Sequence, residues 1–136
     1  MKICIGIPAY KAQNTIEECL SSINIQTIRD EINVVISNDN PGDDYTYLKK
    51  QFPKLHLEFI NADKNGGPGV ARSKVIEQCK DDWIAFMDAD DILYSPFAME
   101  NLYNATRVTG VIQSQAVFVH PIKFPNGETK LVPQNN

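Results

Sequence analysis

The sequence predicts an α/β fold in which a mostly parallel, doubly wound sheet is flanked by helices. Short apolar segments, typical of buried strands, alternate four times with segments whose apolar residues recur at helical spacing. The last part of the chain contains only strand-like segments. We therefore expect an α/β part over residues 1–110 and a β-rich end, a strand and a hairpin, over residues 111–136.

The first strand is expected over residues 3–7, a short run of three isoleucines, a cysteine and a glycine. Pro8 should end this strand, because proline cannot donate to a ladder. A helix should follow over residues 15–25, with Asn14 as its N-cap and Glu17 completing a near capping box.

The second and third strands are expected over residues 32–36 and 55–59. Between them, the polar turn of residues 37–44 leads into a short helix over residues 45–51. Apolar and polar residues alternate in the third strand, which indicates one wetter face and a position at the sheet edge.

A glycine-rich segment, residues 61–69, follows the third strand. Pro68 suits the first position of the next helix, where its missing N–H has no helical partner. The buried stripe of that helix is expected to consist of Val70, Ala71, Val75, Ile76 and Cys79.

The fourth strand is expected over residues 83–87, whose wholly apolar side chains predict burial on both faces. A helix should run over residues 95–108 and a long strand over residues 111–119. The Asn126-Gly127 pair then signals a hairpin turn. The inward residues of the 95–108 helix are expected to be Phe97, Leu102 and Ala105.

Composition excludes several classes of protein. The net charge of −4 and the pI of about 5.1 give no basic footprint for nucleic acid. No apolar run approaches the roughly 20 residues of a transmembrane helix, and residues 1–8 are too short for a signal-peptide core. Cys4, Cys19 and Cys79 lack metal-ligand spacing and predict buried free thiols in a reducing compartment, the cytoplasm.

Three carboxylates, Asp88, Asp90 and Asp91, follow the fourth strand directly. Like charges this close repel, so the cluster must stay in water or be neutralised by a cation. Oxygen ligands of this kind suit Mg²⁺ or Mn²⁺, whereas the alternative is a solvated loop with a helix N-cap in it. Polar residues also follow the other strands, at Tyr10, Asp39 and the glycine segment, which predicts a binding crevice at the carboxyl ends of the sheet.

Several familiar motifs are absent from the sequence. Arg72 stands where a dinucleotide fingerprint would have its last glycine, and there is no P-loop or G-x-S-x-G elbow. An EF-hand beginning at Asp88 would place glycine and glutamate where Leu93 and Met99 stand. His56 and His120 fall on expected strands and are interpreted as structural or surface groups.

The glycine-rich segment and Tyr10 each allow two interpretations. A glycine turn entering a helix offers backbone N–H groups to an anion, and Arg72, one turn later, would add a phosphate contact. Alternatively, the segment is a tight turn with an exposed arginine. Tyr10 either stacks on a flat base or covers its own loop.

Five segments, taken together, resemble family 2 glycosyltransferases over about residues 1–100, in the same order and spacing. They are Pro8-Ala9-Tyr10, Leu20-Ser21-Ser22-Ile23-Asn24-Ile25-Gln26, Asn38-Asp39-Asn40, Asn65-Gly66-Gly67 with Ala71-Arg72-Ser73, and Trp83 to Asp91 ending in D-x-D-D. The resemblance implies a Rossmann-like, GT-A-like domain that binds a nucleoside-diphosphate sugar and transfers the sugar, normally with inversion. UDP-sugars are the donors that it leads us to expect, with a glycan or another acceptor.

The resemblance also assigns roles to individual residues. Tyr10 matches the residue that packs on the nucleobase, Asp39 the acid that hydrogen-bonds it, and Arg72 a residue near the diphosphate. Asp88 matches the first acid of D-x-D, near ribose and metal, and Asp90 the direct ligand of Mn²⁺ or Mg²⁺. The remaining nucleotide-sugar-binding residues are expected to be Pro8, Gly67 and Ala89.

The sequence departs from the family pattern in two places. Asn38 replaces the first acid of the usual D-D pair. Inverting members take a general base from a segment well beyond D-x-D, and here the only carboxylate after Glu100 is Glu128, in the expected hairpin turn. We therefore expect one donor-binding domain over residues 1–136, an N-terminal fragment or a shortened chain, which binds donor and metal but transfers sugar poorly.

Two other functions remain as alternatives. Asp88 to Ile92 approximates the catalytic loop of haloacid dehalogenase-type phosphatases, with Asp88 as nucleophile, although that loop belongs after a first strand and not a fourth. A non-catalytic nucleotide-binding module is the second alternative. Donor binding without turnover would distinguish this module from a transferase.

Overall fold

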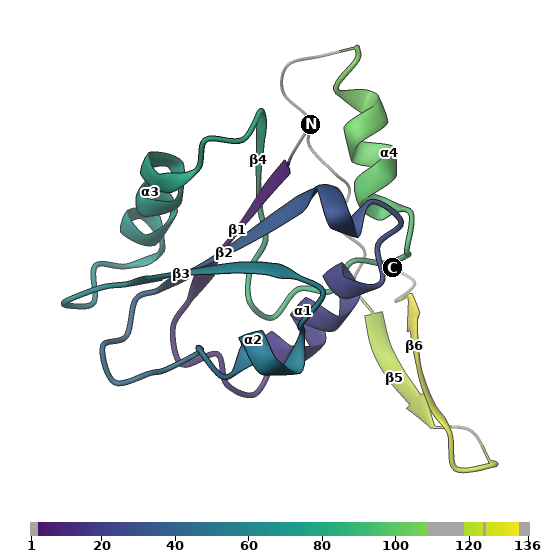
Figure 1. The fold of residues 1–136 in the computed structure, drawn as a ribbon. Coiled ribbons are helices and arrows are strands. Elements are labelled where there is room, and N and C mark those ends of the chain that lie inside the picture. The colour runs from purple at the N-terminus through teal and green to yellow at the C-terminus, as the bar shows by residue number, and fades with distance from the viewer. Residues whose placement is uncertain (1–2, 109–118, 124, 134–136) are drawn as a thin grey trace. The chain divides into compact units, whose positions relative to one another are not determined.

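The computed structural model describes residues 3–108, 119–123 and 125–133. Contacts divide the chain into two compact units, Met1–Asn101 and Leu102–Asn136. The first unit holds a parallel sheet and its helices, and the second holds a hairpin (Figure 1). Among the described residues, no helix has the length and apolar character needed to cross a membrane.

The first unit is built on a four-stranded parallel sheet with the order β3-β2-β1-β4. Its strands are β1 (Ile3–Ala9), β2 (Ile32–Asn38), β3 (His56–Asn61) and β4 (Trp83–Phe86). The chain adds β2 and β3 on one side of β1 and then returns to add β4 on the other. This reversal creates a switch point between β1 and β4, and the sheet confirms the predicted α/β architecture.

Pro8 does not end the first strand as predicted, because β1 and β2 both run two residues further than expected. The N–H of Asp39 donates to the carbonyl of Ala9, while the N–H of Met87 donates to Gly6, so alternate residues of β1 face β2 and β4. Pro8 therefore faces the β4 side, where the ladder has already ended at Gly6. A missing N–H costs nothing there.

Helices cover both faces of the sheet (Figure 1). The helix α1 (Ile16–Asn24) and the short α2 (Leu48–Gln51) lie on one side, and α3 (Pro68–Gln78) lies on the other against β1 and β2. Right-handed crossovers require this arrangement, because the chain reverses direction across the sheet between β3 and β4. A single 3-10 turn, Arg29–Glu31, leads into β2.

The start of α1 differs from the prediction. The N-cap is Thr15 and not Asn14, and it makes no side-chain capping bond, so no capping box forms with Glu17. The Thr15 hydroxyl instead donates to the Ala12 carbonyl. Burial fixes this helix in place of a cap, since Ile16, Cys19, Leu20 and Ile23 are completely buried.

The buried stripe of α3 is narrower than predicted. Ala71 and Val75 are buried, but Val70 and Ile76 are about half exposed, at 45% and 54%. Val75 packs directly over Gly6 of β1, where an added Cβ would lie 2.6 Å from the Val75 Cγ1 atom. The missing side chain of Gly6 thus lets α3 approach the sheet.

Two further elements are less buried or shorter than the sequence predicts. The side chains of β4 are only partly buried, and Phe86 is exposed, because β4 has a strand neighbour on one side within the described residues. The helix expected over residues 95–108 is α4 (Ala98–Ala105), in which Met99 is buried while the preceding Phe97 is exposed.

The second unit contains the predicted hairpin. Its strands, β5 (Val119–Lys123) and β6 (Thr129–Pro133), are antiparallel, and Gly127 in the turn has a φ of 88° that favours glycine. The strand expected over residues 111–119 lies outside the described residues except for Val119.

Candidate functional site

A cavity of about 600 Å³ opens at the carboxyl ends of β1 and β2 and beside the residues that follow β4. This is the switch point, where open α/β sheets bind ligands. Of the residues predicted to bind a nucleotide sugar or metal, the cavity is lined by Pro8, Tyr10, Asp39, Gly67, Asp88, Ala89 and Asp90. Arg72 does not line it but forms an ion pair with Asp88.

Asp39 forms the polar floor of this cavity. Its side chain is buried, and its two carboxylate oxygens accept the N–H groups of Gly66 at 2.9 Å and Gly67 at 2.8 Å. The carboxylate therefore fastens the end of β2 to the start of α3. Gly67, with a φ of 89°, adopts the left-handed conformation that this turn requires.

These two bonds bear on the anion-binding interpretation of the glycine segment. The N–H groups of Gly66 and Gly67 already donate to Asp39, so they are not the free donors that this interpretation needs. A carboxylate has about four acceptor positions, so Asp39 can still accept from a ligand in the cavity. The structure thus makes the glycine turn a support for Asp39.

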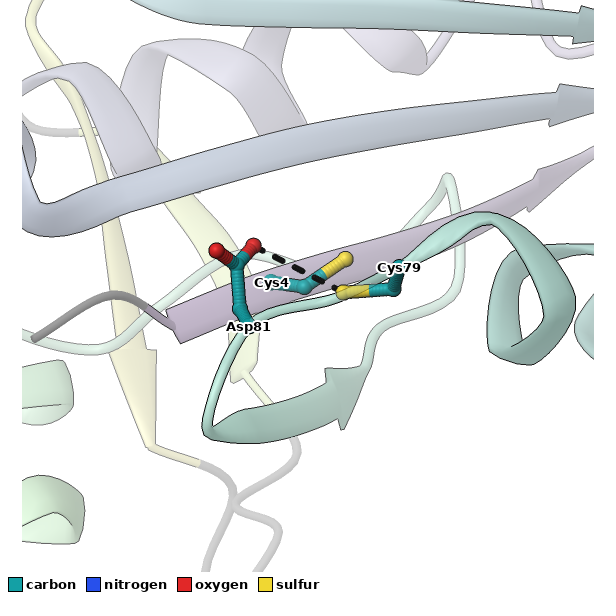
Figure 2. A group of neighbouring side chains, drawn as sticks. All are labelled: Cys4, Cys79 and Asp81. Atoms are coloured by element: carbon teal, nitrogen blue, oxygen red, sulfur yellow. Dashed lines mark hydrogen bonds between the residues drawn. The ribbon is translucent and has the colours of Figure 1, made fainter.

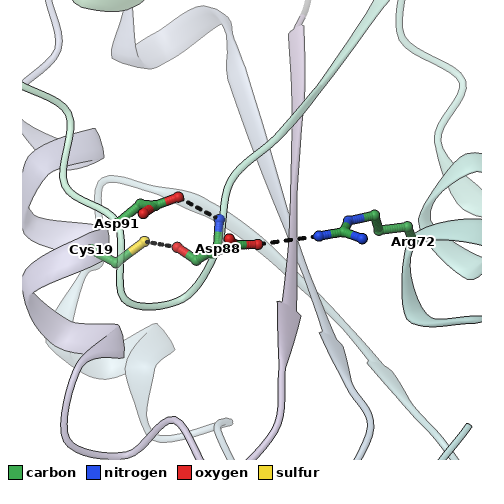
Figure 3. A network of polar contacts seen from close by, with 4 residues as sticks. All are labelled: Cys19, Arg72, Asp88 and Asp91. Carbon is green, nitrogen blue, oxygen red and sulfur yellow. Dashed lines mark hydrogen bonds and ion pairs between the residues drawn. The ribbon is translucent and has the colours of Figure 1, made fainter. Parts of the chain in front are cut away.

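The segment of residues 87–97 between β4 and α4, here called the acid loop, carries Asp88, Asp90 and Asp91 on its exposed side. One carboxylate oxygen of each lies within 4.8 Å of the others. The Asp88 N–H donates to the Asp91 carboxylate at 3.1 Å, and the Asp91 N–H returns to the Asp88 carbonyl at 3.0 Å (Figure 3). The loop thus folds back so that its carboxylates converge.

The charges of the acid loop are only partly compensated. Arg72 Nη2 lies 3.3 Å from Asp88 Oδ1, reaching across from α3 (Figure 3). Partial burial, and then the charges of Asp88 and Asp90, raise the pKa of Asp91 above its usual value, against the lowering effect of the Asp88 N–H. One guanidinium faces three carboxylates, so the loop has the donor chemistry and the surplus charge that suit Mg²⁺ or Mn²⁺.

A hydrogen-bond network that the sequence did not signal holds the loop of Tyr10. The Asp43 carboxylate accepts the N–H of Lys11, whose φ is 51°, and a bond from Gln13. The buried Tyr45 hydroxyl accepts the Ala12 N–H at 3.0 Å and donates to Asp43 at 3.1 Å. Tyr10 itself is 49% exposed at the mouth of the cavity, so its ring is available to a ligand.

The network also shifts two pKa values. Desolvation, opposed by the Ala12 N–H and helped by Asp43, raises the pKa of Tyr45 to about 12, so its hydroxyl remains a donor. For Asp43, desolvation raises the pKa, but the hydrogen bonds from Gln13, Tyr45 and the Lys11 N–H together outweigh it and lower the pKa. In the sequence, Asp43 stands in the expected polar turn and Tyr45 at the start of the expected short helix, and no feature marks either residue.

A second cluster of metal-type ligands lies at the opposite, amino ends of the strands. One ligand atom each of Cys4, Cys79 and Asp81 lies within 4.8 Å of the others (Figure 2). Both Asp81 oxygens accept from the Asn33 amide, at 3.1 and 2.9 Å, and one also accepts the Cys79 thiol at 3.6 Å. Burial, followed by the neighbouring Cys79 and Asp81, raises the pKa of the Cys4 thiol, so this thiol stays neutral.

The cysteines are free, as predicted, but only Cys4 and Cys19 are buried, whereas Cys79 is partly exposed. Burial raises the pKa of Cys19 to about 12, with further contributions from Asp91, Asp90 and Asp88.

Residues 4–128 match the model of a family described as glycosyl transferase family 2. This span is most of the 136 residues. The chain belongs to glycosyl transferase family 2. The expected resemblance is therefore confirmed, and nothing in the described fold favours the phosphatase alternative, because the acid loop follows β4 and not the first strand.

Curated relatives support the family assignment. The chain is 31% identical over 111 residues to a poly(ribitol-phosphate) beta-glucosyltransferase of Bacillus spizizenii, covering 79% of this chain and 17% of that protein. It is 30% identical over 119 residues to the uncharacterized glycosyltransferase YwdF of Bacillus subtilis, covering 88% and 43%. The chain thus spans about a sixth of the first relative and less than half of the second.

Solved structures share the fold. The chain superposes on S. aureus TarS 1-349 with a TM-score of 0.71 at 23% identity, covering 89% of this chain and 40% of that one. It superposes on the mannosyltransferase PcManGT from Pyrobaculum calidifontis, in complex with GDP-Man and Mn²⁺, with a TM-score of 0.70 at 20% identity, covering 77% and 32%. These likenesses confirm the GT-A-like fold class.

Proposed function

We propose that this family 2 chain binds a nucleoside-diphosphate sugar, most simply a UDP-sugar, in the cavity, and that the protein transfers the sugar to an acceptor such as a glycan, with inversion. One observation carries the proposal: Asp88 and Asp90 of the acid loop line the same cavity as Tyr10 and the buried Asp39. The aromatic ring of Tyr10 and the buried acceptor Asp39 suit the base of such a donor, and the acids that can hold a cation suit its ribose and diphosphate.

The proposed roles of the residues are those that the family resemblance assigns, and their positions around the cavity support these roles. Tyr10, half exposed at the mouth, packs on the base, and Asp39 accepts a hydrogen bond from its edge. Asp88 and Asp90 both line the cavity, where Asp88 would lie near the ribose and the metal and Asp90 would be the direct ligand of the metal. Pro8, Gly67 and Ala89 shape the walls between these groups.

The acid loop is the proposed site of Mn²⁺ or Mg²⁺, which would neutralise charge developing on the departing diphosphate. TarS 1-349 has been solved with UDP-GlcNAc, and PcManGT with GDP-Man and Mn²⁺, which supports this assignment by analogy of fold. The Arg72–Asp88 ion pair suggests how these two charged groups change partners when a donor and a cation bind. A bound cation would compensate the charge of Asp88, and Arg72 would then be free to contact the diphosphate.

Titration calorimetry with UDP, with and without Mn²⁺, tests the proposal. The wild-type chain should bind UDP more tightly with Mn²⁺, and Asp90→Ala should reduce that gain at least about tenfold, or roughly 1.4 kcal/mol. Asp82→Ala is the matched control, because Asp82 is an exposed aspartate at the other end of the sheet. UDP affinity that is the same with and without Mn²⁺ would contradict the metal role.

Two further points belong to the proposal. Donor binding with no transfer by the whole protein to any acceptor would favour the non-catalytic nucleotide-binding alternative. Three free cysteines suit a reducing compartment, so we place the domain in the cytoplasm.

A further inference from the structure

We propose that Ser22 and Gln26 are positioning residues that hold the acid loop in its cation-binding arrangement. This inference rests on the proposed donor site and identifies the part of the fold that fixes its geometry. Neither residue lines the cavity. Both are polar side chains buried to about 5% exposure, on or just beyond α1.

The acid loop contributes little to its own conformation. It contains no helix or strand, and two bonds close the turn that carries the acids: the Asp91 N–H donates to the Asp88 carbonyl, and the Asp88 N–H donates to the Asp91 carboxylate. Asp88, Asp90 and Asp91 repel one another in the absence of a cation. An exposed segment with these properties would sample many conformations unless another part of the protein fixed it.

Contacts from α1 and the turn after it supply that restraint. Cys19, Ser22 and Gln26, three and four residues apart, lie on one side of the helix and just beyond its end. The Cys19 thiol lies 3.7 Å from the Asp88 carbonyl (Figure 3), and the Ser22 hydroxyl accepts the Leu93 N–H at 3.0 Å. One bond is made at Asp88 and the other at Leu93, so they hold the two ends of the segment that carries the three acids.

Gln26 fixes the end of the same loop. Its Nε2 donates to the Ser95 carbonyl at 2.8 Å and to the Ser22 carbonyl at 3.0 Å, while its Oε1 accepts the Met99 N–H at 3.0 Å. Met99 is in the first turn of α4, where backbone N–H groups have no helical partner. One amide thus joins α1, the acid loop and the start of α4, and a carboxylate cannot replace it because it cannot donate.

This arrangement bears on cation affinity. Mg²⁺ and Mn²⁺ sites need carboxylate oxygens at defined positions, and ordering a mobile loop on binding would reduce the affinity. The bonds from Ser22 and Gln26 order the loop in advance, against the mutual repulsion of its acids. They should therefore affect the metal-dependent part of nucleotide binding more than the metal-independent part, which Tyr10 and Asp39 provide.

Two pairs of variants test the proposal. Ser22→Ala removes the acceptor of the Leu93 N–H, and Ser21→Ala is its control on the exposed side of the same helix. Gln26→Glu removes the donor to Ser95, and Gln51→Glu makes the same change at an exposed position. The measurements are amide hydrogen exchange of the acid loop, and UDP affinity with and without Mn²⁺.

We expect Leu93 and Asp91 to exchange at least about tenfold faster in Ser22→Ala, with other core amides less affected. The Mn²⁺-dependent gain in UDP affinity should fall about fivefold, the equivalent of one hydrogen bond, and further in Gln26→Glu. Affinity for UDP without Mn²⁺ should stay as in the controls. If Gln26→Glu fails to fold, Ser22→Ala alone decides the outcome.

Other results would separate a positioning role from a merely structural one. A Ser22→Ala variant that loses stability in urea but keeps wild-type loop exchange and the full Mn²⁺-dependent gain would show a merely structural role and overturn the proposal. If the wild type shows no Mn²⁺-dependent UDP binding, the proposed function fails. In that case, faster exchange confined to the acid loop still supports positioning by Ser22, and unchanged exchange overturns it.

Discussion

Each end of the parallel sheet carries a cluster of metal-type ligand side chains. The two clusters differ in how far other groups of the protein already satisfy their charges and hydrogen bonds. At the amino ends, Asp81 is bonded through both oxygens to Asn33, and the thiols of Cys4 and Cys79 lie beside it (Figure 2). At the carboxyl ends, the aspartates of the acid loop are exposed, Asp88 and Asp90 line a cavity, and Arg72 forms an ion pair with Asp88 (Figure 3). Each end brings three metal-type ligand atoms within 4.8 Å.

The difference shows that proximity of ligand atoms does not by itself make a binding site. The amino-end cluster meets its own hydrogen-bonding needs, so ligand binding there would break existing bonds. The acid loop keeps surplus charge and open acceptor positions, and a cation would relieve both. The sheet thus has one end that maintains the fold and one end that is prepared for a ligand.

The largest expected effect tests whether only the carboxyl end binds metal. Mn²⁺ and UDP at about 100 times their dissociation constant should raise the free energy of unfolding by about 2.7 kcal/mol. Asp90→Asn should reduce this increase by at least about 1.4 kcal/mol, whereas Asp81→Asn should preserve it even if the variant starts from lower stability. Urea unfolding with and without Mn²⁺ and UDP measures the difference. An increase that depends on Asp81 would reverse the comparison.

A smaller effect is expected at the amino end, and on stability alone. Asp81→Ala leaves the Asn33 amide without its acceptor, which should lower the free energy of unfolding by about 1–3 kcal/mol. The neighbouring Asp82→Ala, at an exposed position, should change it far less. Urea titration of both variants provides the test, and equal losses would mean that Asp81 contributes no specific bond.

The same comparison explains what the sequence could predict. The order of strands and helices follows from apolar periodicity, and the crevice follows from polar residues placed after each strand, so Tyr10, Asp39 and Asp88 were found before the structure. Asp39 was expected only as a ligand contact, yet it also holds Gly66 and Gly67. Local patterns do not reveal which distant backbone group a side chain bonds.

Most of the contacts that the sequence did not predict are hydrogen bonds between residues far apart in the chain. Gln26 contacts Ser95 and Met99 about 70 residues away, and Tyr45 contacts Ala12, with a sequence separation of 33. Periodicity identified the apolar side of α1 but carried no information about its polar partners. The misassigned exposed residues of α3, Val70 and Ile76, have the same origin, because their burial depends on what lies opposite the helix and not on their own spacing.

The smallest expected effect concerns the pH dependence that the acid loop imposes. The pKa of Asp91 is raised above 3.8, so the folded state holds this proton more tightly than the unfolded chain. The free energy of unfolding must then fall as pH rises from about 3.8 through the raised pKa of Asp91, and this loss of stability persists at neutral pH. Asp91→Asn removes this cost, so the variant should gain on the wild type over that interval and keep the advantage above it.

Urea midpoints measured between pH 3 and pH 7 would show the gain as a difference between the two curves. Saturation with Mn²⁺ and UDP should reduce the difference, because a bound cation relieves the repulsion from Asp88 and Asp90 that contributes to it. Parallel curves without metal would mean that Asp91 is no more strained in the folded chain than in the unfolded one. The carboxyl end would then lack the stored repulsion that distinguishes it from the amino end.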